Sequence, residues 1–317
     1  MIRFIARRLA MAVPTLFGGM VLVFFMLRVL PGDIVAVKLR GDGGNVSQQV
    51  IEQERHRLGL DRSLPVQFAT WVAGAATLDL GTSMWTGRPV SEEIGTRLGL
   101  SFELAVLATL VAVGIAFPLG IAAALWRDTW VDTLIRAISI GGLAIPSFWF
   151  GMLIILLLLN TLDWLPPISF VPIWRDPVAN MSQMIWPALA IGYRYAAVVT
   201  RMLRSSLIEV MKEDYIRTAR AKGVLRRLVV TRHALRNALL PTVTVVGLEF
   251  AFLIGGLVVT EQVFNLNGIG RLMVDAVTRN DFTMVQGIVM LGAVVFVLAN
   301  LVVDVLYAIL DPRIRLA

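Results

Sequence analysis

The run LAVLATLVAVGIAFPLGIAAALW at residues 104–126 contains no charged side chain. A helix needs about 20 apolar residues to cross the hydrocarbon core of a bilayer, so this run is long enough to span one. Further uncharged runs lie at residues 9–27, 137–162, 177–193 and 282–303, and another at 237–260 is interrupted only by Glu249. We expect the short run at 177–193 to continue past Arg194 toward Met202. The sequence therefore predicts an all-α membrane protein with six transmembrane helices.

The composition of the whole chain agrees with a membrane location. Of its 317 residues 57% are hydrophobic and only 16% are charged, and the mean hydropathy is +0.76. An ordinary soluble domain has about 25% charged and about 45–50% apolar residues. A soluble protein of this composition would expose more apolar surface than it could cover, so a soluble enzyme is excluded.

The positive charge of the chain is concentrated in one stretch. The formal net charge is +7, and residues 194–236 alone hold eleven Lys or Arg and three Asp or Glu. Because the remainder is close to neutral, the charge pattern argues against a nucleic-acid partner. The chain has no cysteine, and its two histidines, His56 and His233, are far apart in sequence. We therefore expect no metal site and no disulfide.

The sidedness of the chain follows from its short loops. Segments 1–8, 127–136, 194–236 and 304–317 together carry 18 Lys or Arg, whereas segments 163–176 and 261–281 carry three. Cytoplasmic loops are enriched in these residues, so both termini are expected in the cytoplasm.

The expected organisation has four parts. Residues 1–30 form an N-terminal segment with the first span, residues 31–103 a periplasmic loop or cap, residues 104–310 a five-span core, and residues 311–317 a C-terminal tail. A cytoplasmic loop at 203–236 belongs to the core. Within the cap, Ser47 can begin a helix that stops at Gly59, and Pro65 can begin the next one, near Trp71.

The cytoplasmic loop carries the most informative pattern. Asp214 can cap a short helix at residues 215–222, which Gly223 can end in the left-handed conformation. Tyr215 and Ala219 then lie on one face. Small alanines would let another protein approach this helix closely, so it can serve as a docking site. The alternative is that the basic loop only follows the general rule for cytoplasmic loops. Beyond it, residues 224–236 alternate apolar and basic side chains, which is typical of a helix at an anionic membrane surface.

The exact residues favour docking. The stretches DYIRTARAKG at 214–223 and RHALRNALLP at 232–241 closely resemble the cytoplasmic signature of ABC-importer permeases. Further matching motifs are RF at 3–4, RRL at 7–9, PGD at 31–33, LGLD at 58–61, LPVQ at 64–67, LGTS at 80–83, DVLYA at 304–308 and LDPRIR at 310–315. Together they are similar to the first, B-type membrane subunit of the dipeptide/oligopeptide/nickel family. One departure is Asn267-Gly268, where that family usually has Pro-Gly.

The resemblance implies a type I ABC importer permease fold in a bacterial cytoplasmic (inner) membrane. It implies a second homologous permease subunit, two ATPase subunits, an extracytoplasmic solute-binding protein and membrane lipid as partners. The cargo would be a di- or oligopeptide or a related small solute. The sequence has no G-x-x-x-x-G-K-[ST] motif, so the chain is not expected to be an enzyme or to hold a cofactor; ATP and Mg would be bound by the ATPases.

The resemblance also assigns the docking, or coupling, helix. We expect its ATPase contact to involve Asp214, Tyr215, Ala219, Ala221, Lys222 and Gly223.

Two charges lie inside predicted spans, Arg194 and Glu249. Charges within a membrane are costly and therefore indicate function by default, so both are candidates for the translocation pathway. The alternatives are a structural pair between helices and a residue that faces the partner subunit. A secondary transporter would be expected to show internal repeats or a relay of acids, and a membrane enzyme a catalytic constellation. Neither class accounts for the docking signature.

Overall fold

The computed structural model describes residues 2–29, 35, 47–57 and 59–310 of the chain. In order, the helices are α1 (Ile2–Val29), α3 (Gln48–Arg57), α4 (Leu64–Ala76), α5 (Val90–Leu125), α6 (Trp130–Ala144), α7 (Ser147–Leu162), α8 (Pro177–Val210), α9 (Asp214–Ala221), α10 (Arg226–Leu228), a π-helical turn (Val229–Ala234), α11 (Leu235–Gly256), α12 (Val258–Val263), α13 (Ile269–Thr278) and α14 (Phe282–Leu310). No strand occurs within these ranges beyond an isolated bridge between Thr82 and Pro89. The predicted all-α class is confirmed.

The number of apolar spans is lower than predicted. Among the described residues, four helical stretches are long and apolar enough to cross a membrane: Ala6–Leu27, Val90–Leu125, Arg226–Gly255 and Phe282–Ile309. The pair α6 and α7 qualifies only together, and the two helices meet at an angle of 99°. The predicted span at 137–162 therefore consists of two helices that meet at a sharp bend. Pro146 stands at the break, where it lacks an N–H and cannot continue the helix.

The remaining predicted span is part of α8. This helix runs for 34 residues and continues past Arg194, as predicted. It also contains Arg201 and Arg204, and it is not among the four apolar stretches.

Helix α5 extends into the segment 31–103 that we assigned to the cap. It begins at Val90 and carries Glu92 and Glu93 in its first turn. Carboxylates are favourable there because of the helix dipole. The two cap helices are confirmed: α3 directly follows Ser47, and Pro65 stands in the first turn of α4. The motifs at 31–33 and 311–315, and the predicted tail at 311–317, lie outside the described residues.

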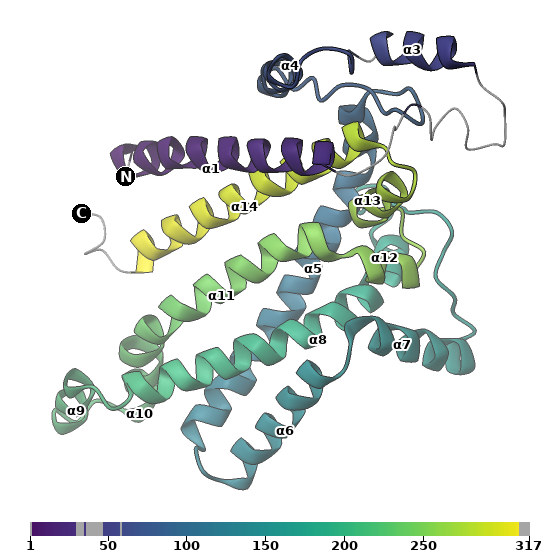
Figure 1. The fold of residues 1–317 in the computed structure, drawn as a ribbon. Coiled ribbons are helices and arrows are strands. Elements are labelled where there is room, and N and C mark those ends of the chain that lie inside the picture. Colours follow the sequence, from purple (N-terminus) through teal and green to yellow (C-terminus); the bar gives the residue numbers. More distant parts are fainter. Residues whose placement is uncertain (1, 30–34, 36–46, 58, 311–317) are drawn as a thin grey trace.

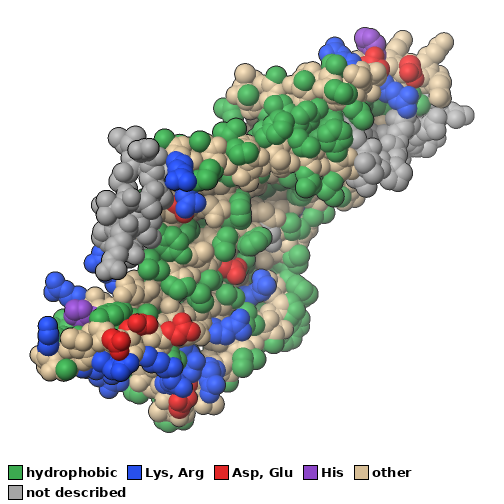
Figure 2. All heavy atoms as spheres, turned by 60° about the vertical axis from the view of Figure 1, so that its left-hand side comes forward, with side chains coloured by type: hydrophobic (Ala, Val, Ile, Leu, Met, Phe, Trp, Pro, Cys, Tyr) green, Lys and Arg blue, Asp and Glu red, His purple; other side chains and the backbone are tan. Residues whose placement is uncertain are grey.

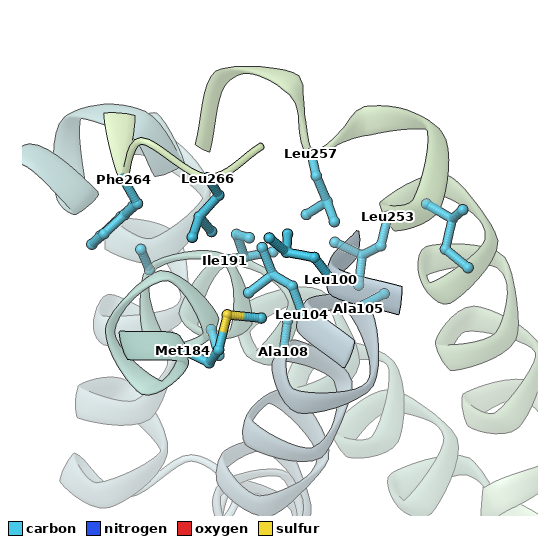
Figure 3. Close-up of a cluster of buried hydrophobic side chains, with 13 residues drawn as sticks. Leu100, Leu104, Ala105, Ala108, Met184, Ile191, Leu253, Leu257, Phe264 and Leu266 are labelled. Carbon is cyan, nitrogen blue, oxygen red and sulfur yellow. The ribbon is translucent and has the colours of Figure 1, made fainter. Parts of the chain in front are cut away.

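The main apolar core forms where α5 packs against α8 (Figure 1). The close-up in Figure 3 shows Leu104 and Ala108 of α5 beside Met184 and Ile191 of α8, under Leu257 from the end of α11. A Cβ at Gly192 would lie 2.6 Å from Val111 Cγ1 and 2.9 Å from the Ala108 carbonyl oxygen. The two backbones therefore approach each other at a place where only glycine fits.

Helix α1 packs along α14 and leaves most of its apolar surface exposed (Figure 1). Near one end its Phe24 ring contacts Phe68 and Trp71 of α4, with ring centroids 5.2 Å and 6.1 Å apart. Near the other end Arg8 forms a 3.0 Å ion pair with Asp304 of α14. The cap is thus fastened to the membrane helices through aromatic packing.

Candidate functional site

The predicted docking helix is present as α9. It begins one residue earlier than expected, and Glu213 rather than Asp214 occupies the N-cap position. The prediction that Asp214 caps the helix is therefore wrong: its carboxylate instead forms a 2.9 Å ion pair with Arg217 one turn later. The predicted end is confirmed, because Gly223 has φ +74° and its N–H donates to the Arg220 carbonyl at 3.0 Å.

Helix α9 packs on the protein through an apolar cluster. Ile216 is fully buried, in a cluster with Leu203 and Leu207 of α8 and with Val229 and Ala234 of the π-helical turn. It is the only large aliphatic residue between positions 214 and 223, and this was the signal available in the sequence. We did not predict its role.

A hydrogen bond adds a second attachment for α9. The Asn237 side-chain amide of α11 donates to the Tyr215 hydroxyl at 2.7 Å. Tyr215 remains 41% exposed, so its ring is held in place and still accessible to a partner.

The proposed contact residues of α9 do not all face the same way. Ala219 is partly buried against the cluster that holds Ile216, whereas Ala221 and Gly223 are exposed. A Cβ placed on Gly223 would meet no atom within 4 Å. The accessible surface of α9 is therefore formed by one aromatic ring, small residues and charged side chains.

The end of the molecule that carries α9 is basic. Figure 2 shows blue Lys and Arg side chains gathered at the lower end, where Figure 1 places α9 and α10. The exposed basic residues between positions 212 and 236 are Lys212, Arg217, Arg220, Lys222, Arg226, Arg227, Arg232 and Arg236. The predicted surface helix at 224–236 is only partly confirmed. Leu225 is 71% exposed, but Val229 is fully buried against α8 and α9 because the chain forms a π-helical turn there.

An ion pair that we did not predict joins α8 to α6 near α9. Asp132 is fully buried, and its two carboxylate oxygens accept hydrogen bonds from Nε and Nη2 of Arg204, each at 2.7 Å. Such a two-point contact fixes the relative orientation of both side chains. Arg204 and Ile216 lie on either side of the turn between α8 and α9.

The two intramembrane charges lie near each other without direct contact. Glu249 of α11 is half-buried and borders a small cavity together with Tyr195 and Leu253. Arg194 is exposed, with its guanidinium carbon 5.8 Å from the centroid of the Tyr195 ring. The ion pairs found among the described residues do not include Arg194 with Glu249, so the alternative of a direct structural pair has no support in this conformation.

At the opposite end of the molecule a buried carboxylate organises the segment after α11. Glu261 is fully buried, and it accepts hydrogen bonds from the Ser101 hydroxyl at 2.7 Å and from the Arg271 N–H at 2.9 Å. Burial raises the pKa of this carboxyl, and the two hydrogen bonds oppose that rise. A Cβ on Gly268 would clash with the same carboxylate, which explains the glycine in the Asn267-Gly268 pair.

A second buried carboxylate fastens the cap. Asp281 accepts hydrogen bonds from the Ser83 hydroxyl, and from the N–H groups of Met84 and Met284, each at 3.1 Å. Met284 belongs to the first turn of α14. The motif at 80–83 is thus held against the start of the last helix, and no signal within that motif alone identified this partner.

Comparison with known proteins agrees with this architecture. The family described as "binding-protein-dependent transport system inner membrane component" matches residues 116–316, and the N-terminal family of such membrane components matches residues 1–105. The chain is 42% identical over 315 residues to the glutathione transport system permease protein GsiC of Escherichia coli O6:H1, covering 99% of both chains.

Two further relatives cover the chain as completely. A glutathione transport system permease protein GsiC of Salmonella paratyphi A is also 42% identical over 315 residues, again covering 99% of both chains. A putative peptide transport system permease protein of Brucella abortus is 40% identical over 311 residues, covering 98% of both chains. Because the first family match covers more than half of the chain, the protein belongs to the family of inner membrane components of binding-protein-dependent transport systems.

Proposed function

We propose that this chain is one of two permease subunits of an ATP-driven importer for small peptides, and that α9 is the site at which an ATPase subunit docks. The observation that carries the docking proposal is the geometry of α9. A short helix projects from the basic end of the molecule, is seated by buried Ile216, and leaves Tyr215 and Ala221 accessible.

The finer topology belongs to the same proposal. Six spans result if the bent pair α6 and α7 counts as one crossing and α8 as another. Both termini are then cytoplasmic, which agrees with the basic end around α9. Figure 1 shows the beginning of α1 and the end of α14 directed toward that same end.

Movement would pass from α9 into the membrane through α8. Closure of the ATPases would push on α9, whose Ile216 packs on Leu203 and Leu207 of α8. The Arg204–Asp132 pair would then carry the displacement to α6. For such coupling α9 must contact the ATPase differently in the two states of the cycle. ATP and Mg would be bound by the ATPase, and the solute would be delivered by an extracytoplasmic binding protein.

The proposed cargo rests on the names of the relatives. Those relatives are described as transporting glutathione or peptides, so we propose a small peptide as the solute. The pathway would run between this chain and a homologous second permease. Glu249 is the candidate to meet a charged peptide group, since it is an acidic residue within the apolar stretch of α11.

The docking proposal is tested with two substitutions of Gly223. Since a Cβ at this position meets no neighbour, a substitution changes only the backbone preference. Gly223→Val strains the left-handed turn, whereas Gly223→Asn tolerates it and serves as the matched control. The tagged chain is purified gently from native membranes, co-purifying proteins are identified by mass spectrometry, and ATP-dependent uptake of a labelled dipeptide is measured in vesicles.

We expect a second permease and the ATPases to co-purify with the wild type and with Gly223→Asn. Both the ATPases and uptake should be lost with Gly223→Val. A Gly223→Val chain that retains its ATPases and transports normally would refute the docking assignment. For the pathway, Glu249→Gln should change uptake or the range of peptides accepted, and unchanged transport would remove Glu249 from the pathway.

A further inference from the structure

A cavity of about 360 Å³ lies between the cap and the membrane helices. Its walls come from α1, the end of α3, α4, the loop before α5 and the first turns of α14. Figure 1 shows α4 close to the ends of α1 and α14, at the end of the molecule away from α9. The proposed function makes no use of this cavity.

Two hydrogen-bond donors in the cavity wall have no partner. The Trp71 indole N–H and the Gln286 side-chain amide nitrogen are both buried and form no hydrogen bond with the part of the chain that the structure describes. Only 5% of the surface of Gln286 is exposed. A buried donor without a partner costs about 1–3 kcal/mol, so two of them in one wall indicate a ligand that supplies acceptor atoms.

One basic side chain of the wall can meet an acceptor group of a ligand. His56, Arg57, Arg62 and Asp79 border the cavity, but Arg57 is paired with Glu54 and His56 lies 3.8 Å from Asp61, which leaves Arg62. One oxygen of Asp79 already accepts the Gly81 N–H at 3.0 Å. Arg62 takes part in none of the ion pairs found among the described residues, so its guanidinium is available to a ligand.

The wall is also built to hold its shape. The Gln67 amide donates to the Arg62 carbonyl at 2.7 Å and to the Leu60 carbonyl at 3.1 Å, which fixes the loop that carries Arg62. On the other side a Cβ at Gly74 would lie 2.6 Å from the Asp79 carbonyl oxygen, so α4 and the next loop approach each other where only glycine fits. The site is therefore largely formed before a ligand arrives.

We propose that this cavity binds the phosphate group of a membrane phospholipid. Phosphate oxygens are acceptors and carry negative charge, so they can satisfy Trp71 and Gln286 while pairing with Arg62. The position of the cavity favours lipid over free phosphate. Apolar side chains of α1, including Phe17 and Phe25, are exposed beside α4 and can lie along the acyl chains. Trp71 has the amphipathic ring that is typical of the membrane–water interface.

The test uses the full-length protein purified in a mild detergent. Phosphatidylglycerol is added, and bound lipid is measured by native mass spectrometry together with the melting temperature. Inorganic phosphate and uncharged diacylglycerol are the comparison ligands. Gln286→Leu and Trp71→Phe remove one donor each, and Arg62→Gln tests the exposed cation without threatening the fold. Arg175→Gln, an exposed arginine outside the cavity, is the matched control.

We expect phosphatidylglycerol to bind the wild type and raise its melting temperature. Each of the three cavity variants should bind about tenfold more weakly, and the control should bind normally. Without lipid, Gln286→Leu should melt higher than the wild type, because it removes a buried donor that has no partner.

Equal lipid binding by the wild type and Gln286→Leu would overturn the proposal. So would stabilisation by inorganic phosphate with none by phosphatidylglycerol, since the lipid would then not be the source of the phosphate. Stabilisation by diacylglycerol as strong as that by phosphatidylglycerol would also overturn it, because binding would not need the phosphate group.

Discussion

Replacing Ile216 by alanine tests whether one buried side chain holds α9 in place. Ile216 is fully buried between α8 and the π-helical turn. A further attachment of α9 is the hydrogen bond from Asn237 to the Tyr215 hydroxyl. Ile216→Ala should therefore increase the local opening of α9 and leave the core between α5 and α8 intact.

The size of the effect follows from the packing. Truncating a buried Ile to Ala costs about 2–5 kcal/mol, and the cost is smaller where neighbours can relax. Because α9 lies at the edge of the molecule, we take about 2–3 kcal/mol. Each 1.4 kcal/mol corresponds to about tenfold in an equilibrium constant, so opening should increase about 30- to 140-fold. Ile216→Val, which costs about 0.5–1.5 kcal/mol, should increase it by about tenfold at most.

The assay is amide hydrogen exchange read by mass spectrometry. Peptides covering residues 213–223 report the opening of α9, and peptides from α5 report the core as an internal control. The same variants are assayed for ATP-dependent uptake. Uptake should fall in the order wild type, Ile216→Val, Ile216→Ala, since a helix that is mostly open cannot transmit force to α8.

Two results would refute this reasoning. Unchanged exchange at 213–223 in Ile216→Ala would show that Ile216 does not hold α9. Faster exchange together with normal uptake would show that a fixed α9 is not needed for transport.

Gly268→Ala should destabilise the protein by about 1–3 kcal/mol, because its Cβ would clash with the Glu261 carboxylate, whereas Gly114→Ala has open space and should melt normally. Asp132→Asn should cost about 3–5 kcal/mol in unfolding free energy, because it leaves Arg204 without its buried anion, and a loss below about 1 kcal/mol would show that the pair is dispensable. Burial raises the pKa of Glu261. The folded protein therefore holds this proton more tightly, and the stability gained below about pH 4.3 is lost as the pH rises through the raised pKa. The melting temperature of the wild type should fall as the pH rises from 4, and the melting temperature of Glu261→Gln should not show this fall. The same pH dependence in both proteins would contradict a raised pKa of Glu261.

Four of the predicted apolar spans were predictable because their signals are local. An uncharged run long enough to cross a bilayer can be read directly, as at residues 104–126, and Gly223 marks the end of α9 by its conformational freedom alone. The size of the angle between α6 and α7 at Pro146, 99°, was not predictable. A proline shows where a helix breaks, but the angle depends on how α6 and α7 pack on α8.

The contacts that position the candidate site were not predictable from local pattern. Asp132 and Arg204 are 72 positions apart, and nothing in either segment names the other as its partner. The sequence shows Ile216 as an isolated large aliphatic residue in a polar stretch. Its burial could not be predicted from that stretch, because the residues that cover it belong to α8 and the π-helical turn. The N-cap of α9 was predicted one residue too late, at Asp214 instead of Glu213, because either of these two adjacent acidic residues can precede a helix.

The central claim is that the exposed surface of α9 touches an ATPase. The chain has no cysteine, so a single introduced cysteine is a unique attachment point. Ala221→Cys lies on the exposed part of α9, and Thr86→Cys, exposed in the loop before α5, is the control at the other end. After gentle purification with its partners, the protein is treated with a short thiol-to-amine crosslinker and the products are identified by mass spectrometry. We expect crosslinks from position 221 to an ATPase subunit and none from position 86. Crosslinks from position 86 with none from position 221 would contradict this claim.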